Sequence, residues 1–286
     1  MSTLLEVAGA CKTYTMGGIL SRNEVRAVQD VSFTLETDKA EIFTIIGESG
    51  SGKSTLARMI LAMTPPTAGR IVFAGTDIAA LRSRRDKLGF MKSVQPIFQN
   101  PFEAFNPLKK VDRYLFMTAR RFNGARRGAV EEQSDAALKK VGLSLNEVKG
   151  RFPHELSGGQ LQRIAIARAL IPGPSLIVAD EPVSMVDASL RTSIVNLFMK
   201  LRDELGVSII YITHDLATAY YISDRIIIMK KGVVVEAGEA RTVLAAPQHP
   251  YSIELKNAVL SPDAAITGET LEAMNIEEAL EPEMSG

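Results

Sequence analysis

The clearest pattern in the chain is a set of short, continuously apolar segments. Ile42–Ile46, Leu176–Ala179 and Ile209–Ile212 are rich in β-branched residues and contain no charged side chain. Such runs are typical of strands that are covered on both faces, as they are in a parallel sheet. The three segments therefore predict a parallel central sheet.

Helical periodicity lies between these segments. Thr55–Met63 follows the first segment and Ser189–Leu205 precedes the third. A further helix is expected where four apolar residues share one face, namely Leu161, Ile164, Ala165 and Ala169. Strands that alternate with helices predict an α/β fold.

The first part of the chain has a different pattern. Leu4–Val7, Val28–Leu35 and Arg70–Phe73 resemble shorter, more exposed strands that are separated by turns. We expect these segments to form a small antiparallel sheet beside the central one.

From about Pro101 to Arg151 the strand signal is weak, while helix-compatible stretches and charges are dense. This texture predicts an inserted helical subdomain at about 101–160. Between residues 109 and 127 the single acid Asp112 stands against seven basic residues, which are Lys109, Lys110, Arg113, Arg120, Arg121, Arg126 and Arg127. Two interpretations remain open: a solvated helical surface, or a surface that docks near a membrane subunit or anionic head groups.

The composition is that of a folded globular protein. The chain has 286 residues, 46% hydrophobic and 23% charged, which fits one large domain or a core with an inserted lobe. Lys+Arg 33 balance Asp+Glu 33, so bulk charge does not favour binding to nucleic acid. No apolar stretch reaches the roughly 20 residues that span a bilayer, and the amino end lacks a secretory signal pattern. Cys11, the only cysteine, fits a reducing cytoplasm and is most simply a small buried residue.

Residues 47–54, Gly-Glu-Ser-Gly-Ser-Gly-Lys-Ser, fit G-x-x-x-x-G-K-[ST] between a predicted strand and a predicted helix. Glycines let successive N–H groups converge on phosphate oxygens, and the helix adds its positive end, so a plain Gly/Ser turn is a weak alternative. We expect Lys53 to reach the β- and γ-phosphates of ATP and Ser54 to offer its hydroxyl to Mg²⁺. The residues expected around the phosphates are Gly47, Glu48, Ser49, Gly50, Ser51, Gly52, Lys53, Ser54 and Thr55.

Two acids follow the second apolar segment. Asp180 is expected to hold Mg²⁺ directly or through water, and Glu181 to accept a proton from the attacking water. Adjacent acids after a strand are often only a helix cap or a solvated turn. The phosphate loop makes the catalytic interpretation the stronger one.

Residues 156–160, Leu-Ser-Gly-Gly-Gln, are identical to the signature of ABC-type ATPases, and the chain resembles that family. Ser157 can cap the helix that follows, whose amino end can then approach a phosphate. The resemblance implies an α/β fold with a P-loop NTPase (RecA-like) core, a small antiparallel β-subdomain and an inserted helical subdomain. It also implies a head-to-tail dimer with two ATP molecules, in which one subunit's γ-phosphate is faced by Ser157, Gly158, Gly159 and Gln160 of the other.

Other residues match the family pattern at the expected places. Gln99 resembles the glutamine that touches magnesium and the attacking water, and His214 resembles the switch histidine that contacts the γ-phosphate. Tyr14 resembles the aromatic residue that stacks on adenine, with a plain core or surface tyrosine as the alternative. Asp187 falls in the family's interface loop. The implied catalytic group is therefore Glu181, His214 and Gln99, and the implied magnesium site is Ser54, Gln99 and Asp180.

The resemblance covers about residues 3–255, which we take as the nucleotide-binding domain. It is closest to the ATPases of oligopeptide and dipeptide permeases through 47–54, Phe105–Leu108 and Pro247–Ser252, while Met16–Arg22 is similar to the second ATPase of such systems. It implies a heterodimer with a paralogue in preference to a homodimer, two membrane permease subunits, an indirect extracytoplasmic solute-binding protein, and no nucleic acid. The implied place is the cytoplasmic face of the cell membrane, and the implied cargo is peptide, oligosaccharide or nickel.

Several features depart from the family or extend beyond it. Asp38–Glu41 replaces a usual glycine before glutamate, Asn100 stands where aspartate is common, and Met185-Val186 is unusual in the interface loop. None of these removes a catalytic group. Some relatives hold an iron-sulfur cluster with cysteines near the carboxyl end, but Cys11 is the only thiol here and we predict no cluster. Residues 256–286 are expected to be an acidic, solvated or loosely packed tail.

Three other functions are known for ATPases of this type, and sequence features argue against each of them. A soluble ABC-type ATPase that acts on nucleic acid or ribosomes usually has two cassettes or a long inserted coiled coil, and the sequence shows neither. An ATP-sensing subunit with little turnover is disfavoured because Lys53, Asp180, Glu181 and His214 are all present. An exporter is disfavoured because many exporters fuse the ATPase to membrane helices.

Overall fold

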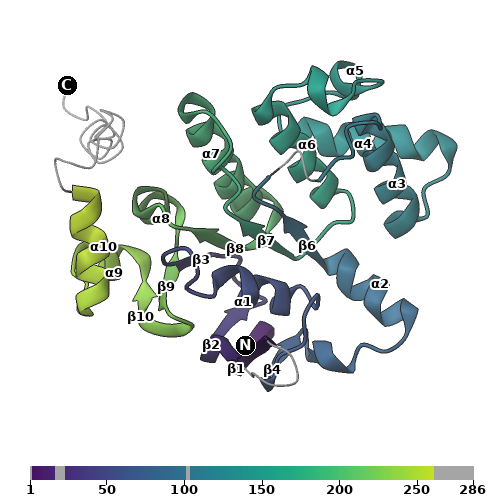
Figure 1. Cartoon of the computed structure of the whole chain (residues 1–286). Helices are drawn as coiled ribbons and strands as arrows, with labels where there is room; N and C mark the ends of the chain where they lie inside the picture. The colour runs from purple at the N-terminus through teal and green to yellow at the C-terminus, as the bar shows by residue number, and fades with distance from the viewer. Residues whose placement is uncertain (1, 17–22, 101–103, 261–286) are drawn as a thin grey trace, which may run out of the picture.

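The computed structural model of the protein describes residues 2–16, 23–100 and 104–260. In this part of the chain two sheets lie against each other and a group of helices stands beside the larger sheet (Figure 1). No helix within these ranges is long and apolar enough to cross a membrane. The expected turn at Met16–Arg22 and the expected acidic tail lie largely outside the described residues, at 17–22 and 261–286.

The larger sheet has six strands and is parallel except for one edge. In spatial order its strands are β10 (Val233–Glu239), β9 (Arg225–Lys230), β3 (Ile42–Ile46), β8 (Ser208–Thr213), β7 (Leu176–Asp180) and β6 (Val94–Ile97). Each residue of β3 and β8 is buried. The predicted parallel sheet is confirmed, and its double coverage explains why its central strands are continuously apolar.

Three strands of this sheet were not predicted. β9 has the same apolar pattern as its neighbours, so its signal was present in the sequence. β6 contains Gln95 and Pro96 and lies at the sheet edge, where a proline does not interrupt pairing on the open side. β10 has only half-buried and exposed positions and pairs antiparallel with β9 at the other edge of the sheet.

Helices cover both faces of the central sheet. The helix expected at Thr55–Met63 begins two residues earlier and ends three earlier, as α1 (Lys53–Ile60). The helix expected at Ser189–Leu205 is α7 (Ala188–Leu205). The remaining helices of this part are α2 (Arg84–Ser93), α8 (Leu216–Ile222), α9 (Ala240–Ala245) and α10 (Pro250–Leu260).

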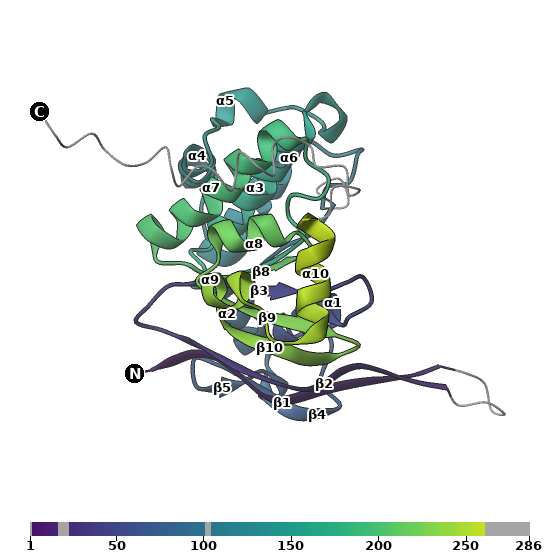
Figure 2. The same ribbon diagram turned by 90° about the vertical axis from the view of Figure 1, so that its left-hand side faces the viewer.

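The second sheet is antiparallel, as predicted, but its first two strands are much longer than predicted. Its order is β2 (Asn23–Glu36), β1 (Thr3–Met16), β4 (Ala68–Phe73) and β5 (Thr76–Asp77). β1 and β2 form a 14-residue ribbon that extends beyond the rest of the sheet (Figure 2). Register shifts between Val7 and Lys12 interrupt the alternation of apolar and polar residues, which hid the length of β1. As expected, these strands are more exposed than β3 and β8, although Leu5, Val7 and Leu35 are buried.

The inserted helical subdomain is confirmed. Between β6 and β7 the chain forms α3 (Val111–Asn123), α4 (Arg127–Lys140), α5 (Leu145–Val148) and α6 (Gly158–Leu170). Asp112 is buried, and its carboxylate accepts a hydrogen bond of 3.0 Å from the Gly150 N–H. The one acid of the basic segment therefore serves the interior of the subdomain.

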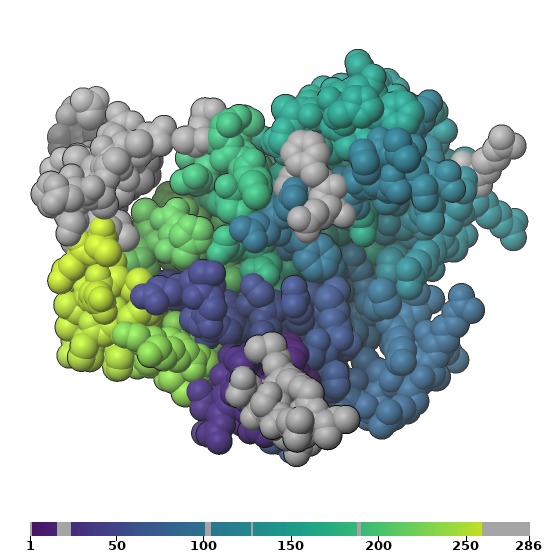
Figure 3. Space-filling view, in the orientation of Figure 1, coloured from purple at the N-terminus to yellow at the C-terminus, as the bar shows by residue number. Residues whose placement is uncertain are grey.

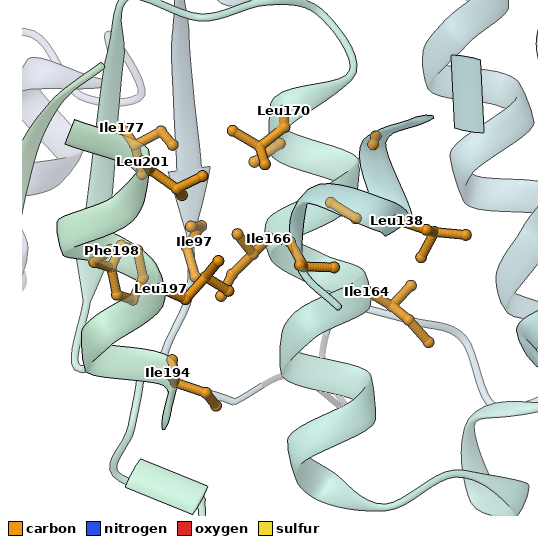
Figure 4. Close-up of a cluster of buried hydrophobic side chains, with 14 of the residues drawn as sticks. Ile97, Leu138, Ile164, Ile166, Leu170, Ile177, Ile194, Leu197, Phe198 and Leu201 are labelled. Carbon is orange, nitrogen blue, oxygen red and sulfur yellow. The ribbon is translucent and has the colours of Figure 1, made fainter. Parts of the chain in front are cut away.

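A shared hydrophobic core joins the helical subdomain to the sheet. Figure 4 shows side chains of α6 and α7 meeting those of β6 and β7. Phe198 of α7 is fully buried, and its ring packs edge-on against the ring of Tyr211 in β8, with 5.6 Å between the centroids. Residues of the subdomain and of the sheet therefore belong to one continuous core.

Phe198→Ala tests the importance of this core. We expect the substitution to lower the free energy of unfolding by about 3–5 kcal/mol, because it removes a buried ring and leaves a cavity. Urea denaturation followed by circular dichroism measures the change. The matched control is Leu205→Ala on the same helix, whose side chain is 38% exposed and should cost about 1 kcal/mol or less. Equal effects of the two substitutions would contradict the prediction.

Candidate active site

The phosphate loop lies between β3 and α1, where the backbone of two neighbouring segments restricts it. A Cβ atom added to Gly47 would lie 2.3 Å from the Met229 carbonyl oxygen, and one added to Gly52 would lie 2.2 Å from the Ala27 carbonyl oxygen. Both residues also have positive φ angles. Only glycine fits at these two positions. By contrast, a Cβ on Gly50 would meet nothing within 4 Å, so this part of the loop faces open space.

Lys53 is buried at the centre of the loop. Its Nζ donates hydrogen bonds of 2.6 Å to the Gly47 carbonyl oxygen and 2.8 Å to the Glu48 carbonyl oxygen. Burial lowers the pKa of Lys53, while the carboxylates of Glu181 and Asp180 act in the opposite direction. A buried ammonium group that is held only by neutral carbonyls can exchange them for a stronger, anionic acceptor.

The loop also contains a polar atom with no partner. The Ser51 hydroxyl is buried and makes no hydrogen bond within the described residues. Buried hydroxyl groups are normally paired, so this one marks a place where a ligand or water supplies the partner. The unpaired hydroxyl, the buried Lys53 and the glycine-shaped backbone together fit a phosphate group.

Asp180 ends β7 next to the loop. The Ser54 hydroxyl lies near its carboxylate. Burial raises the pKa of Asp180, the polar Ser54 hydroxyl and the charge of Lys53 partly offset this rise, and the nearby Glu181 adds to it. A hydroxyl and a carboxylate held together are oxygen ligands of the kind that Mg²⁺ prefers.

Glu181 has an unusual backbone conformation that turns the chain after β7. Its φ angle is 45°, and its N–H donates a 2.9 Å hydrogen bond to the Ile212 carbonyl oxygen of β8. Non-glycine residues in this region are uncommon and mark positions that the surroundings hold in place. The bend brings the carboxylate to the carboxyl edge of the sheet, where open α/β sheets bind ligands.

Three predicted catalytic residues meet at this carboxylate. Gln99 Nε2 donates a 3.0 Å hydrogen bond to Glu181 Oε2, and His214 Nδ1 lies 3.0 Å from Glu181 Oε1. The Glu181 side chain is 19% exposed, whereas the His214 side chain is 64% exposed. The structure therefore brings together residues that follow β6, β7 and β8, and His214 presents its ring to solvent.

The signature residues lie elsewhere, at the start of α6 in the helical subdomain (Figure 1). Ser157 and Gln160 form a reciprocal cap: the Ser157 hydroxyl accepts from the Gln160 N–H at 3.2 Å, and Gln160 Oε1 accepts from the Ser157 N–H at 3.0 Å. A Cβ on Gly159 would lie 2.7 Å from a methyl carbon of Leu190, so a larger residue at this position would require the Leu190 side chain to move. The cap satisfies two backbone N–H groups at the amino end of α6, the end of a helix whose partial positive charge favours anions.

Two further predicted residues are less closely tied to the loop. Tyr14 lies in β1, paired with Val25, and Lys12 Nζ is 5.3 Å from its ring centroid. Its adenine-stacking role stays a prediction. Asp187 stands at the N-cap of α7, where its carbonyl oxygen rather than its side chain accepts from the helix.

The sequence did not reveal which neighbouring segments restrict the conformation of the phosphate loop. The close approaches to Gly47 and Gly52 come from carbonyl oxygens of Met229 and Ala27, on strands far away in sequence. Backbone atoms carry no side-chain signature, so no motif could have identified them.

The contrast between two loop glycines can be tested. We expect Gly47→Ala to lower the melting temperature clearly and to abolish ATP binding, because the new methyl group collides with backbone. Gly50→Ala should cost only about 1 kcal/mol, since the space there is open and only the positive φ opposes alanine. Differential scanning fluorimetry with and without ATP measures both effects. A Gly47→Ala protein as stable as Gly50→Ala would refute the close approach.

Comparison with known sequences places the chain among membrane-transport ATPases. A family model described as "ABC transporter" matches residues 28–184. The probable peptide ABC transporter ATP-binding protein y4tS of Sinorhizobium fredii is 41% identical over 265 residues, which is 92% of this chain and 74% of that protein. The dipeptide transport ATP-binding protein DppF of Haemophilus influenzae is 39% identical over 268 residues, 91% of this chain and 80% of that protein.

Solved structures show the same architecture. The ATP-binding cassette MJ0796, in a dimeric post-hydrolysis state bound to ADP and Pi, matches with a TM-score of 0.72 at 29% identity, over 83% of this chain and 99% of that one. The protein cbiO1 from Clostridium perfringens, part of the ABC transporter complex cbiONQ, matches with a TM-score of 0.73 at 26% identity, over 95% and 100% of the two chains. The predicted ABC ATPase fold is confirmed, and the chain belongs to the ATP-binding, ATP-hydrolysing subunits of the ABC transporter family.

Proposed function

We propose that this ATPase hydrolyses Mg²⁺-ATP at the edge formed by β3, β7 and β8 and thereby drives import of peptides through a membrane partner. The observation that carries the proposal is the hydrogen-bonded group of Gln99, Glu181 and His214 beside Asp180 and the phosphate loop. These are the residues that the chemistry of phosphoryl transfer to water requires at one place.

In this proposal the tasks are divided among the residues of the site. Residues 47–55 surround the phosphates and hold them through the Lys53 ammonium and through N–H groups of the loop other than that of Glu48, which Tyr251 binds. Ser54, Asp180 and Gln99 would supply oxygen ligands for Mg²⁺. When bound, Mg²⁺ would neutralise negative charge on the phosphate oxygens. Glu181 accepts the proton of the attacking water, which Gln99 orients, and the exposed His214 contacts the γ-phosphate. Tyr14 stacks on the adenine ring.

A second subunit completes the site. Ser157, Gly158, Gly159 and Gln160 occupy the amino end of α6, in a different part of the molecule from the phosphate loop (Figure 1). Each motif occurs once in the chain, so two chains arranged head to tail are needed to bring a signature to each phosphate loop. The similar cassette MJ0796 is dimeric in its solved state. We propose a heterodimer with a paralogous ATPase, with a homodimer as the alternative, and residues 1–255 as the nucleotide-binding unit.

A groove between the sheet and the helical subdomain fits the membrane partner. Its volume is about 500 Å³, and it lies between β6, α2 and α3. Met63, Met91 and Met117 line it and are 53%, 40% and 55% exposed, and Arg120 and Arg121 stand at its side. Flexible methionines adapt to an inserted helix. β6 leads directly to Gln99, so a permease helix in this groove would be coupled to the hydrolysis site.

The remaining partners follow from this placement. Two permease subunits would seat the dimer on the cytoplasmic face of the membrane, and an extracytoplasmic solute-binding protein would act through them, without nucleic acid. Peptide is the cargo we favour because the relatives y4tS and DppF carry peptide and dipeptide transport in their names. Oligosaccharide and nickel are the alternatives.

Glu181→Gln tests the assignment of the base. The amide keeps the size of the side chain but accepts no proton, so we expect the turnover number to fall by about 10²–10⁴ while ATP binding is retained. Phosphate release by the assembled complex and binding of a fluorescent ATP analogue measure the two quantities. Glu204→Gln, at an exposed position of α7, is the control. Unchanged turnover in Glu181→Gln would end this assignment.

The cargo is tested on the intact complex. We expect purified transporter in vesicles, supplied with its solute-binding protein, to hydrolyse ATP faster when di- or oligopeptides are added than when oligosaccharides or nickel are added. Stimulation by nickel or an oligosaccharide but by no peptide would replace the proposed cargo and leave the ATPase assignment intact.

A further inference from the structure

The carboxyl-terminal helix reaches the phosphate loop. Tyr251, the second residue of α10, is 1% exposed, and its hydroxyl accepts a 3.1 Å hydrogen bond from the N–H of Glu48. Figure 3 shows the yellow carboxyl-terminal segment directly beside the dark blue segment that carries the loop. The segment Pro247–Ser252 was singled out in the sequence, yet hydrolysis as described above gives it no task.

The ring of Tyr251 is held firmly. It belongs to a buried cluster with Ile46, the residue before the loop, and Leu216 of α8, and Lys230 Nζ lies 4.2 Å from the ring centroid. The start of α10 is tied down as well: His249 Nδ1 accepts from the Tyr251 N–H at 3.1 Å. Because the ring is held in place, its hydroxyl restricts the position of the Glu48 N–H that it binds.

The hydrogen-bond network around α10 extends to the sheet edge. The Glu236 carboxylate of β10 accepts from the N–H groups of Gln248 at 2.8 Å and His249 at 3.2 Å. These contacts fix the turn that leads into α10, so the helix cannot shift independently of β10. The position of the Tyr251 hydroxyl is thus set by the central sheet.

Glu48 is the residue through which Tyr251 can act on the site. Its N–H is bound by Tyr251, and its carbonyl oxygen is one of the two acceptors that hold Lys53. Burial raises the pKa of Tyr251, so the hydroxyl stays protonated at neutral pH, where its oxygen accepts the hydrogen bond from the Glu48 N–H.

We propose that Tyr251 is a positioning residue for ATP binding: through Glu48, the carboxyl-terminal helix holds the phosphate loop in the shape that receives the triphosphate. A loop that is ordered before binding loses less conformational freedom when the nucleotide arrives, so affinity rises without any contact between Tyr251 and ATP. This inference rests on the proposed role of Lys53 and its loop.

Tyr251→Phe removes the hydroxyl and keeps the buried ring. We expect the dissociation constant of a fluorescent ATP analogue, and the KM for ATP of the assembled complex, to rise about three- to tenfold, the effect of one lost hydrogen bond. The kcat should stay within about twofold, because saturating ATP restores the loop. The melting temperature should change little. A purely structural role would instead lower the melting temperature and kcat and leave KM unaltered.

Hydrogen exchange reports on the contact itself. The Glu48 amide of the nucleotide-free, full-length protein should be protected in the wild type and exchange about tenfold faster or more in Tyr251→Phe. Rapid exchange of this amide in the wild type overturns the proposal even if the variant does not fold.

Two controls separate the interpretations. Tyr221→Phe removes a hydroxyl that donates to Asn196 at 2.9 Å on the surface of α7 and α8, and should leave KM and exchange unchanged. Lys53→Ala should abolish nucleotide binding. If Lys53→Ala binds ATP normally, the proposed phosphate loop fails. If Lys53→Ala fails to bind but Tyr251→Phe matches wild type in KM and exchange, only the role of Tyr251 is overturned.

Discussion

The parallel register of β3, β8 and β7 is the constraint on which the site depends. Ile46 pairs with Thr213, and Asp180 pairs with Ile212, so the three strands end at the same edge of the sheet. The hydrogen bond from the Glu181 N–H to the Ile212 carbonyl oxygen extends this register one residue beyond β7. Because the strands end together, the phosphate loop, the two acids and His214 emerge side by side.

This edge holds charges that are costly to bury. Burial lowers the pKa of Lys53 and raises that of Asp180, the directions expected when low-dielectric surroundings disfavour the charged form. The opposite charges nearby and the carbonyl oxygens of the loop offset only part of this effect of burial on the two pKa values. Lys53 and Asp180 are therefore stabilised electrostatically when an anionic nucleotide and a cation bind beside them, which favours binding of such ligands at this site.

The elements around this edge connect it to the rest of the molecule. β6 joins Gln99 to the helical subdomain, and α10 joins the loop to the carboxyl-terminal segment through Tyr251 and Glu48. Shared packing makes these connections stiff, because Phe198 and its neighbours bury α6 and α7 against the sheet (Figure 4). Gln99, which follows β6, is in turn bonded directly to Glu181.

The sequence by itself determined the parallel sheet, the phosphate loop and the signature helix, because each has a local cause. Buried strands need continuous apolar residues, a phosphate loop needs glycines at fixed spacing, and Ser157 with Gln160 caps its own helix. Only the tertiary structure decided the length of β1 and β2, since bulges break their pattern and pairing alone reveals them. It also decided the meeting of Gln99 with Glu181 and of Tyr251 with Glu48, because contacts between distant segments depend on how the sheet orders its strands.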